Sequence, residues 1–260
     1  MTELIFIEGV SGVGKSTMVR MLSEELEARG YNVKRYVEFD YANPIDFYCT
    51  AYLFLDEYEM LLQKYIAVTD VIKANTINAG EIMLVRYYNE NTPLFEEPLL
   101  SELIQKEFCY KPSRLVTLDE YTCTYKNVWK NYASDIDETY DFIIFDGSLL
   151  HHPINDMMRN YHIDGEQAIA HVGGLLDSLG ERKRWIFYLK TEDIGRQLKK
   201  AHITRKQSIP TNRQIEFWEN RYVNDMLVLS NIKENYHIFN VSNNNWDSVR
   251  TQIVKRLESK

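Results

Sequence analysis

A glycine-rich segment at residues 9–16 constrains the fold of this chain more than any other part of its sequence. It reads Gly-Val-Ser-Gly-Val-Gly-Lys-Ser and lies between an apolar run, 4–7, and a run with helical spacing, 15–27. The pattern GxxxxGK(S/T) between a strand and a helix predicts a P-loop, because glycines let backbone N–H groups turn inward and a helix N-terminus attracts anions. A second predicted strand, 32–39, completes a βαβ unit whose two strands are expected to be parallel.

Each fixed position of the P-loop has a chemical role. We expect Lys15 to reach the β- and γ-phosphates of a nucleoside triphosphate and the Ser16 hydroxyl to be a ligand of Mg²⁺. ATP and Mg²⁺ are therefore the expected cofactors. The residues expected to bind the nucleotide are Gly9, Ser11, Gly12, Val13, Gly14, Lys15, Ser16 and Thr17.

A second magnesium ligand is expected at the end of a nearby parallel strand. The clearest apolar run after the first, 142–145, ends in Asp146. Since the carboxyl ends of parallel strands face the ligand crevice, we expect Asp146 to hold Mg²⁺ through water, together with Ser16. The alternative is that Asp146 only caps the turn at Gly147 and Ser148.

The remaining patterns predict an α/β protein with the three-layer P-loop NTPase fold. Five apolar runs alternate with helical spacing, which indicates a doubly wound, parallel, five-stranded sheet. The runs are 4–7, 32–39, 142–146, 185–189 and 236–241. Because no linker-like stretch divides the chain, we expect one domain over 1–260, with a helical insertion at 81–137 and a lid region at 192–222.

Charge and cysteine usage exclude several classes of partner. The net charge is −8, whereas nucleic-acid-binding proteins usually carry a basic balance or a basic stripe. The three cysteines form no CxxC pair, which indicates reduced thiols in a reducing compartment. The sequence shows neither a basic leader followed by an apolar stretch nor a run of ~20 apolar residues. We therefore expect a cytoplasmic protein that binds neither nucleic acid nor a membrane.

The opening of the chain resembles a known group of kinases. Residues 6–17 read Phe-Ile-Glu-Gly-Val-Ser-Gly-Val-Gly-Lys-Ser-Thr, which is similar to the first segment of thymidylate kinases and deoxynucleoside kinases. Farther along, the strand at 185–189 is followed by a basic stretch, 196–206, where such kinases have a lid whose arginines close over the transferring phosphoryl group. The resemblance implies a lid role for Arg205, with Lys206 beside it, ahead of Arg196, Arg213 and Arg221.

The resemblance does not extend to the residues that bind the phosphoryl acceptor in these kinases. A thymidylate kinase has Asp-Arg after its third strand and deoxynucleoside kinases have an acidic-Arg-Ser triplet, whereas this chain has Asp146-Gly147-Ser148. A thymidylate kinase also carries an aspartate where Ser11 stands. The acceptor therefore stays open between a nucleoside- or nucleotide-like compound and another small hydroxyl compound.

Glu38 is the candidate general base on the acceptor side. It lies at the carboxyl end of the second predicted strand, and deoxynucleoside kinases keep their base glutamate at a similar place. Asp40 is the alternative base, and a plain rim carboxylate is the alternative role for Glu38. The pair His151-His152 has no third ligand nearby in the sequence, which favours a loop role or substrate contact over a metal site.

Two further groups of side chains, arginines and aromatic residues, each have two possible roles. Arg86 and Arg159 either bind acceptor charge or, more simply, lie at the surface. The aromatic residues after Glu38 either stack on a ring substrate or fill the core, and they are Tyr41, Phe47, Tyr48 and Tyr52.

These observations together predict an ATP-dependent phosphotransferase that moves the γ-phosphoryl group to a small-molecule acceptor. Lys15, Glu38 and Arg205 are the expected catalytic residues, and Ser16 and Asp146 are the expected metal ligands. The alternative is a P-loop ATPase that acts as a regulatory or partner-switching module without such an acceptor. Beyond the acceptor, a second copy of the chain in a homodimer stays open as a partner.

Overall fold

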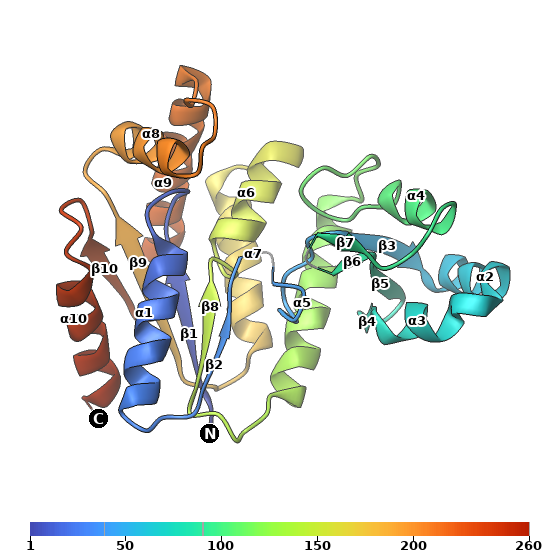
Figure 1. The fold of residues 1–260 in the computed structure, drawn as a ribbon, viewed down its shortest axis with the longest axis horizontal. Helices are drawn as coiled ribbons and strands as arrows, with labels where there is room; N and C mark the ends of the chain where they lie inside the picture. Colours follow the sequence, from blue (N-terminus) through green and yellow to red (C-terminus); the bar gives the residue numbers. More distant parts are fainter. Residues whose placement is uncertain (39, 90, 260) are drawn as a thin grey trace.

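The central sheet contains the five parallel strands that the sequence predicts. In the computed structural model, which describes residues 1–38, 40–89 and 91–259, they lie in the order β10-β9-β1-β8-β2 (Figure 1). Phe39, the last residue of the predicted second strand, lies outside the described residues. The strands are β1 (Glu3–Glu8), β2 (Val33–Tyr36), β8 (Phe142–Asp146), β9 (Arg184–Lys190) and β10 (Tyr236–Asn240).

Helices cover both faces of this sheet and give the three layers of the predicted fold. Successive side chains of β1 alternate between two cores, because a strand has a side-chain period of two. Leu4 and Phe6 pack in one core, and Ile5 and Ile7 in the other. The second core includes α1 (Lys15–Ala28) and α10 (Trp246–Glu258). The first core includes α5 (Leu118–Asp135), α6 (His151–Asn160), α7 (Gly165–Ser178) and α9 (Asn212–Asn231).

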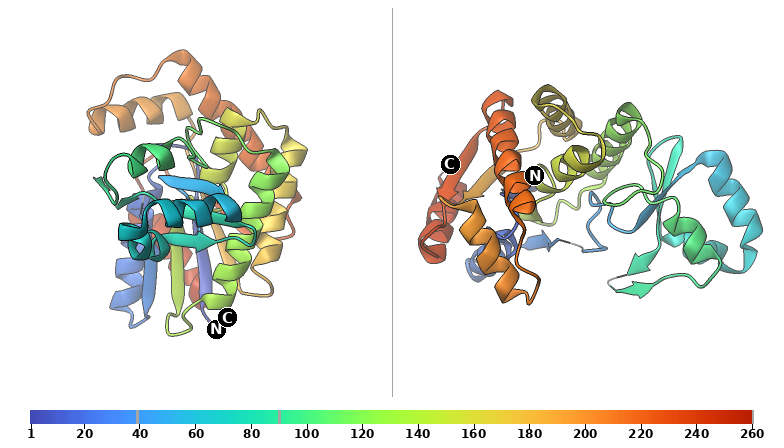
Figure 2. Two further views of the ribbon diagram at one scale, coloured as in Figure 1. Left: turned by 90° about the vertical axis from the view of Figure 1, so that its right-hand side faces the viewer. Right: turned by 90° about the horizontal axis from the view of Figure 1, so that it is seen from above.

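A lobe with its own small core extends from one side of the sheet (Figures 1 and 2). Its antiparallel sheet has the order β3-β5-β4, and a hairpin, β6-β7, follows. The strands are β3 (Thr50–Phe54), β4 (Thr76–Asn78), β5 (Ile82–Arg86), β6 (Tyr88–Asn89) and β7 (Thr92–Pro93). The helices are α2 (Leu55–Lys64), the 3₁₀ helix η1 (Ile66–Val68), α3 (Thr69–Ala74) and α4 (Leu99–Ile104).

The lobe differs from the helical insertion predicted at 81–137. It begins earlier, at β3, and its core joins two strands, β3 and β5, to the helices α2, α3 and α4. The long helix α5, which the prediction included, packs against α7 in the main body instead. The sequence was misleading because β3 is a short apolar run, which periodicity alone does not distinguish from the start of a helix.

The predicted lid region, 192–222, forms α8 (Ile194–Thr204) and the first half of α9. Figure 1 shows α8 above the carboxyl edge of the sheet, over the loop that joins β1 to α1. Among the described residues, none of the helices combines the length and the apolar character needed to cross a bilayer.

Candidate active site

The carboxyl ends of three neighbouring strands bring the predicted site residues together. β1 leads into the P-loop, Glu38 follows β2 by two residues, and β8 ends at Asp146. In the register of the sheet, Ile7 pairs with Asp146. Because β8 lies between β1 and β2, Asp146 lies between the P-loop and Glu38, at the edge of the sheet where α/β proteins bind their ligands.

The backbone of the P-loop has the shape that its glycines were expected to permit. Gly9, Gly12 and Gly14 have φ angles of 143°, 76° and 99°, in a range that side chains disfavour. A Cβ atom at Gly9 would lie 2.4 Å from the carbonyl oxygen of Leu189, and one at Gly14 would lie 2.3 Å from the Trp246 ring. Glycine is therefore required here, and Gly14 directly precedes the first turn of α1, whose N–H groups can receive phosphate.

Lys15 lies across this cradle. Its side chain is buried, and its Nζ donates to the carbonyl oxygens of Gly9 at 3.1 Å and Val10 at 3.4 Å. These bonds hold the ammonium group at the loop itself, where a phosphate oxygen can replace the carbonyl oxygens as its partner.

Asp146 has the properties expected of a magnesium ligand. It is fully buried, and burial raises the pKa of its carboxyl group, although Lys15 and a hydrogen bond from Ser16 act in the opposite direction. Its Oδ2 accepts from the backbone N–H of Glu38 at 3.4 Å, while its Oδ1 has no hydrogen-bond partner among the described residues. An orphaned carboxylate oxygen next to a hydroxyl fits the oxygen ligands that Mg²⁺ prefers.

Glu8, a residue to which the sequence gave no role, fixes the loop after β8. Its buried carboxylate accepts from the backbone N–H groups of Leu149 and His151, each at 2.9 Å. Burial raises the pKa of Glu8 to about 7, against the effect of these two hydrogen bonds. A glutamate at the end of an otherwise apolar strand was the signal in the sequence.

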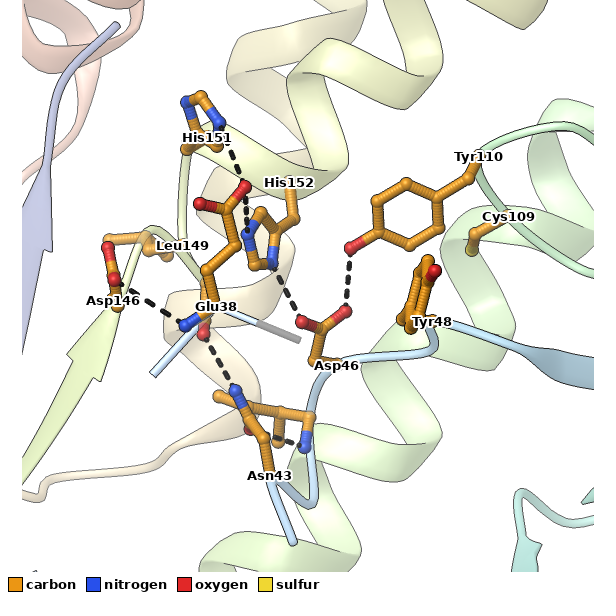
Figure 3. A network of polar contacts seen from close by, with 12 residues as sticks. Glu38, Asn43, Asp46, Tyr48, Cys109, Tyr110, Asp146, Leu149, His151 and His152 are labelled. Carbon is orange, nitrogen blue, oxygen red and sulfur yellow. Dashed lines mark hydrogen bonds and ion pairs between the residues drawn. The ribbon is translucent and has the colours of Figure 1, made fainter. Parts of the chain in front are cut away.

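Glu38 meets both histidines at the start of α6, as Figure 3 shows. Its Oε1 lies 4.0 Å from the Nε2 atom of His151 and 4.0 Å from that of His152. No third ligand lies near this pair in the sequence, but the fold supplies Glu38, which β2 delivers from a distant part of the chain. Asp40, the alternative base, accepts from the backbone N–H of Ala42 at 2.8 Å and so holds a turn.

The second ring nitrogen of each histidine also has a partner. His151 Nδ1 lies 3.1 Å from the carbonyl oxygen of Gly9, and His152 Nδ1 lies 3.1 Å from Asp46 Oδ2. Asp46 is itself buried and accepts from the Tyr110 hydroxyl at 2.8 Å. These contacts orient both imidazole rings, with their Nε2 atoms toward Glu38 (Figure 3).

The two histidines differ in charge. Burial, and then the nearby Lys15, lower the pKa of His151 well below its ordinary value, so its ring is neutral. Burial also disfavours a charge on His152, but Asp46, Glu38 and Asp146 outweigh it and raise the pKa of His152 to about 9. His152 therefore places a positive charge next to two carboxylates at neutral pH.

Two of the arginines considered from the sequence support loops. Arg86 donates to the carbonyl oxygens of Tyr41 and Asn43, which is neither a surface role nor acceptor binding. Arg221, one of the lid candidates, is fully buried. Its guanidinium pairs with Asp225 at 2.6 Å and donates to the carbonyl oxygen of Leu150 at 2.6 Å.

The helix α8 touches the P-loop directly. Gln197 Nε2 donates to the carbonyl oxygen of Gly12 at 2.8 Å, and a Cβ atom at Gly12 would lie 2.7 Å from that of Ala201. Arg205 follows Ala201 by one helical turn, caps the C-terminus of α8 and is exposed. Its predicted lid role stays a prediction.

Comparisons with known proteins give a likeness of fold only. No family model matches the sequence, and no curated protein matches it. The thymidylate kinase of Candida albicans aligns at 16% identity over 99% of this chain and 92% of that one, with a TM-score of 0.47. The YorR protein of Bacillus subtilis, in complex with phosphorylated GDP, aligns at 14% identity over 98% of this chain and 95% of that one, with a TM-score of 0.47. Neither alignment carries a substrate or a residue role over to this chain.

Proposed function

We propose that this protein transfers the γ-phosphoryl group of ATP to a hydroxyl group of a small molecule. The observation that carries the proposal is the position of Asp146. Its carboxyl group is within reach of the Ser16 hydroxyl, its Oδ1 has no hydrogen-bond partner among the described residues, and its Oδ2 contacts the backbone of Glu38. A magnesium ligand and a candidate base are thereby joined at the edge of one P-loop. A P-loop alone serves many functions, whereas a carboxylate on the acceptor side is what phosphoryl transfer to a hydroxyl requires.

The residues divide the chemical task between them. Lys15 and the backbone of the loop bind the β- and γ-phosphates, and Ser16 and Asp146 hold Mg²⁺, which neutralises phosphate charge when bound. Glu38 accepts the proton of the attacking hydroxyl. Its side chain is 26% exposed, so an acceptor can reach its carboxylate. Arg205 would add positive charge when α8 closes over the phosphates.

The surroundings of Glu38 favour an acceptor that has a ring. Tyr48 lies 6.1 Å from Tyr41 and 5.4 Å from Tyr110 between ring centroids, and Tyr41 and Tyr48 are only half-buried. Aromatic faces of this kind stack on planar ligands. The other two aromatic candidates, Phe47 and Tyr52, are buried in the core. A nucleoside, a nucleotide or an aromatic hydroxyl compound satisfies these conditions.

A transfer assay tests the proposal. The protein is incubated with γ-labelled ATP, Mg²⁺ and a panel of nucleosides, nucleotides and other hydroxyl metabolites, and labelled products are separated. We expect Lys15→Ala to abolish transfer and to weaken ATP binding. Glu38→Gln should reduce transfer ~100-fold or more and leave ATP binding within about twofold, because a general base contributes to the chemical step. Lys73→Ala, at an exposed position of α3 in the lobe, is the matched control.

Two results contradict the proposal. Transfer that persists in Lys15→Ala would show that the P-loop does not bind the reacting nucleotide. ATP hydrolysis that needs no small acceptor, depends on Lys15 and is unaffected by Glu38→Gln would favour the regulatory ATPase instead.

A further inference from the structure

Three side chains from two parts of the chain converge next to the proposed magnesium site. They are Glu38, after β2, and His151 and His152, on the first turn of α6 (Figure 3). One ligand atom from each lies within 4.8 Å of the other two. Both histidines are buried, so two imidazole nitrogens and one carboxylate face a common point away from bulk water.

The distances within this cluster are those of ligands around an ion. Glu38 Oε1 lies 4.0 Å from each Nε2 atom, which is too long for a direct hydrogen bond. A cation at the centre of such a triangle lies ~2.3–2.5 Å from each corner, and Zn²⁺ bonds to nitrogen and oxygen are ~2.0–2.2 Å long. Shifts of a few tenths of an ångström by the three side chains, of which Glu38 is partly exposed, close the difference.

The outer contacts of both histidines are the ones that metal-binding histidines make. A ligating imidazole usually gives its other nitrogen to a carboxylate or a backbone carbonyl, which fixes the tautomer and the ring orientation. Here His152 Nδ1 faces Asp46 and His151 Nδ1 faces the carbonyl oxygen of Gly9. In addition, both ring nitrogens of His152 are buried without a hydrogen-bond partner among the described residues, although Nδ1 has its ion-pair contact with Asp46. A buried nitrogen of this kind calls for a ligand.

We propose that Glu38, His151 and His152 bind a transition-metal cation of the Zn²⁺ class, at a site separate from the Mg²⁺ site of Ser16 and Asp146. Two imidazoles and one carboxylate are ligands that suit Zn²⁺ and Co²⁺, whereas Mg²⁺ prefers oxygen alone. Three protein ligands leave a fourth position open, as in catalytic rather than structural zinc sites. An oxygen atom of a substrate can occupy that position.

The inference does not rest on the proposed kinase activity, but it bears on it. An occupied site engages the Glu38 carboxylate as a ligand and places a cation where the acceptor is expected. The metal would then orient and polarise the acceptor oxygen, and Glu38 would serve as a metal ligand in place of its role as the base. Metal binding is therefore measured directly, in the absence of nucleotide, so that its outcome does not depend on any transfer assay.

The test uses the full chain, freed of metal by a chelator and held in millimolar Mg²⁺ so that the oxygen site is saturated. Co²⁺ is added and the visible absorption spectrum is recorded, after which Zn²⁺ is titrated in competition. We expect one equivalent of Co²⁺ to give the intense d–d bands of a low-coordinate site with nitrogen ligands, and one equivalent of Zn²⁺ to abolish them.

Variants assign the ligands. Glu38→Gln, His151→Gln and His152→Gln should each remove the Co²⁺ spectrum, and Asp46→Asn should weaken Zn²⁺ binding ~10–100-fold through the ring orientation of His152. His162→Gln changes an exposed histidine outside the cluster and should leave binding unchanged. Circular dichroism and thermal unfolding verify that each variant is folded, and Asp46→Asn keeps all three ligands if a ligand variant is not. The proposal is overturned if the wild type binds no stoichiometric Co²⁺ or Zn²⁺, or if binding survives in all three ligand variants.

Discussion

Replacement of Arg221 by methionine tests whether this residue stabilises the fold or, as the sequence allowed, acts as an arginine of the lid. The guanidinium and the Asp225 carboxylate are both fully buried and 2.6 Å apart. Loss of the arginine leaves the Asp225 charge buried without its counter-ion, which costs ~3–5 kcal/mol of the free energy of unfolding. It also removes the hydrogen bond to the carbonyl oxygen of Leu150, next to His151, so the loop at the site loses a support.

The double variant Arg221→Met/Asp225→Leu tests whether the unpaired charge of Asp225 causes this loss of stability. An apolar pair of similar volume removes both buried charges and is close to neutral by itself. However, the Leu150 carbonyl group and the Tyr188 hydroxyl, which donates to Asp225 at 2.7 Å, are then left without partners, at ~1–3 kcal/mol in total. We therefore expect the double variant to be more stable than Arg221→Met alone, although it contains one more substitution.

Equilibrium unfolding in urea, followed by circular dichroism, measures these differences. Arg213→Met, on the exposed start of the same helix, is the control and should stay within ~0.5 kcal/mol of the wild type. The reasoning is refuted if Arg221→Met unfolds within about 1 kcal/mol of the wild type while phosphoryl transfer is lost. That result would make Arg221 a reacting arginine of the lid.

Two further predictions concern stability. Gly14→Ala should destabilise the fold by ~1–3 kcal/mol more than Gly30→Ala, because both glycines have a positive φ but only Gly14 faces the Trp246 ring; equal losses in thermal unfolding would contradict this. His171→Phe should reduce the fall in the free energy of unfolding that occurs as the pH is lowered. Burial and then Lys126 lower the pKa of His171 to about 3. Between pH 6.5 and 3 this histidine is therefore protonated in the unfolded chain and neutral in the folded one. Stability is then lost as pH falls from 6.5 toward 3, by up to ~4–5 kcal/mol, and parallel curves for the two proteins would refute the assignment.

The main sheet was predictable because its signals are local. Four of its strands are runs rich in apolar residues, and the P-loop pattern stands between the first strand and its helix. The remaining strand, β2, reads Val-Lys-Arg-Tyr, and its position followed from the βαβ unit that the P-loop begins. The lobe was not predictable by the same means. The partners of β3 lie at β5 and beyond, and the pairing of strands distant in the chain leaves no mark on the short run from Thr50 to Phe54.

The site divides in the same way. The placement of Lys15, Ser16 and Asp146 at one edge follows from the P-loop and from parallel strands, and the structure has this arrangement. The partners of the histidines do not follow, since Glu38 and Asp46 reach His152 only through the fold. Asp46 is a lone aspartate in the sequence, with no pattern around it that distinguishes a residue of the site.

Gly147 explains why an arginine at this position and the observed histidine pair do not occur together. It stands where the kinases that this chain resembles carry an arginine, and its φ is 72°, in a region that disfavours side chains. A Cβ atom there would lie 2.9 Å from the Cβ atom of His151 and 3.1 Å from Cε of Lys15. An arginine at this position and His151 in its observed place are therefore mutually exclusive unless the loop moves. Arginine offers a permanent charge and a fork of donors for an anionic acceptor, whereas two oriented imidazoles offer single nitrogen atoms that bind a proton or a metal ion. Glycine at this position thus leaves imidazole nitrogens where an arginine would place a guanidinium, and the proposed acceptor is to be sought by its fit to Glu38, His151 and His152.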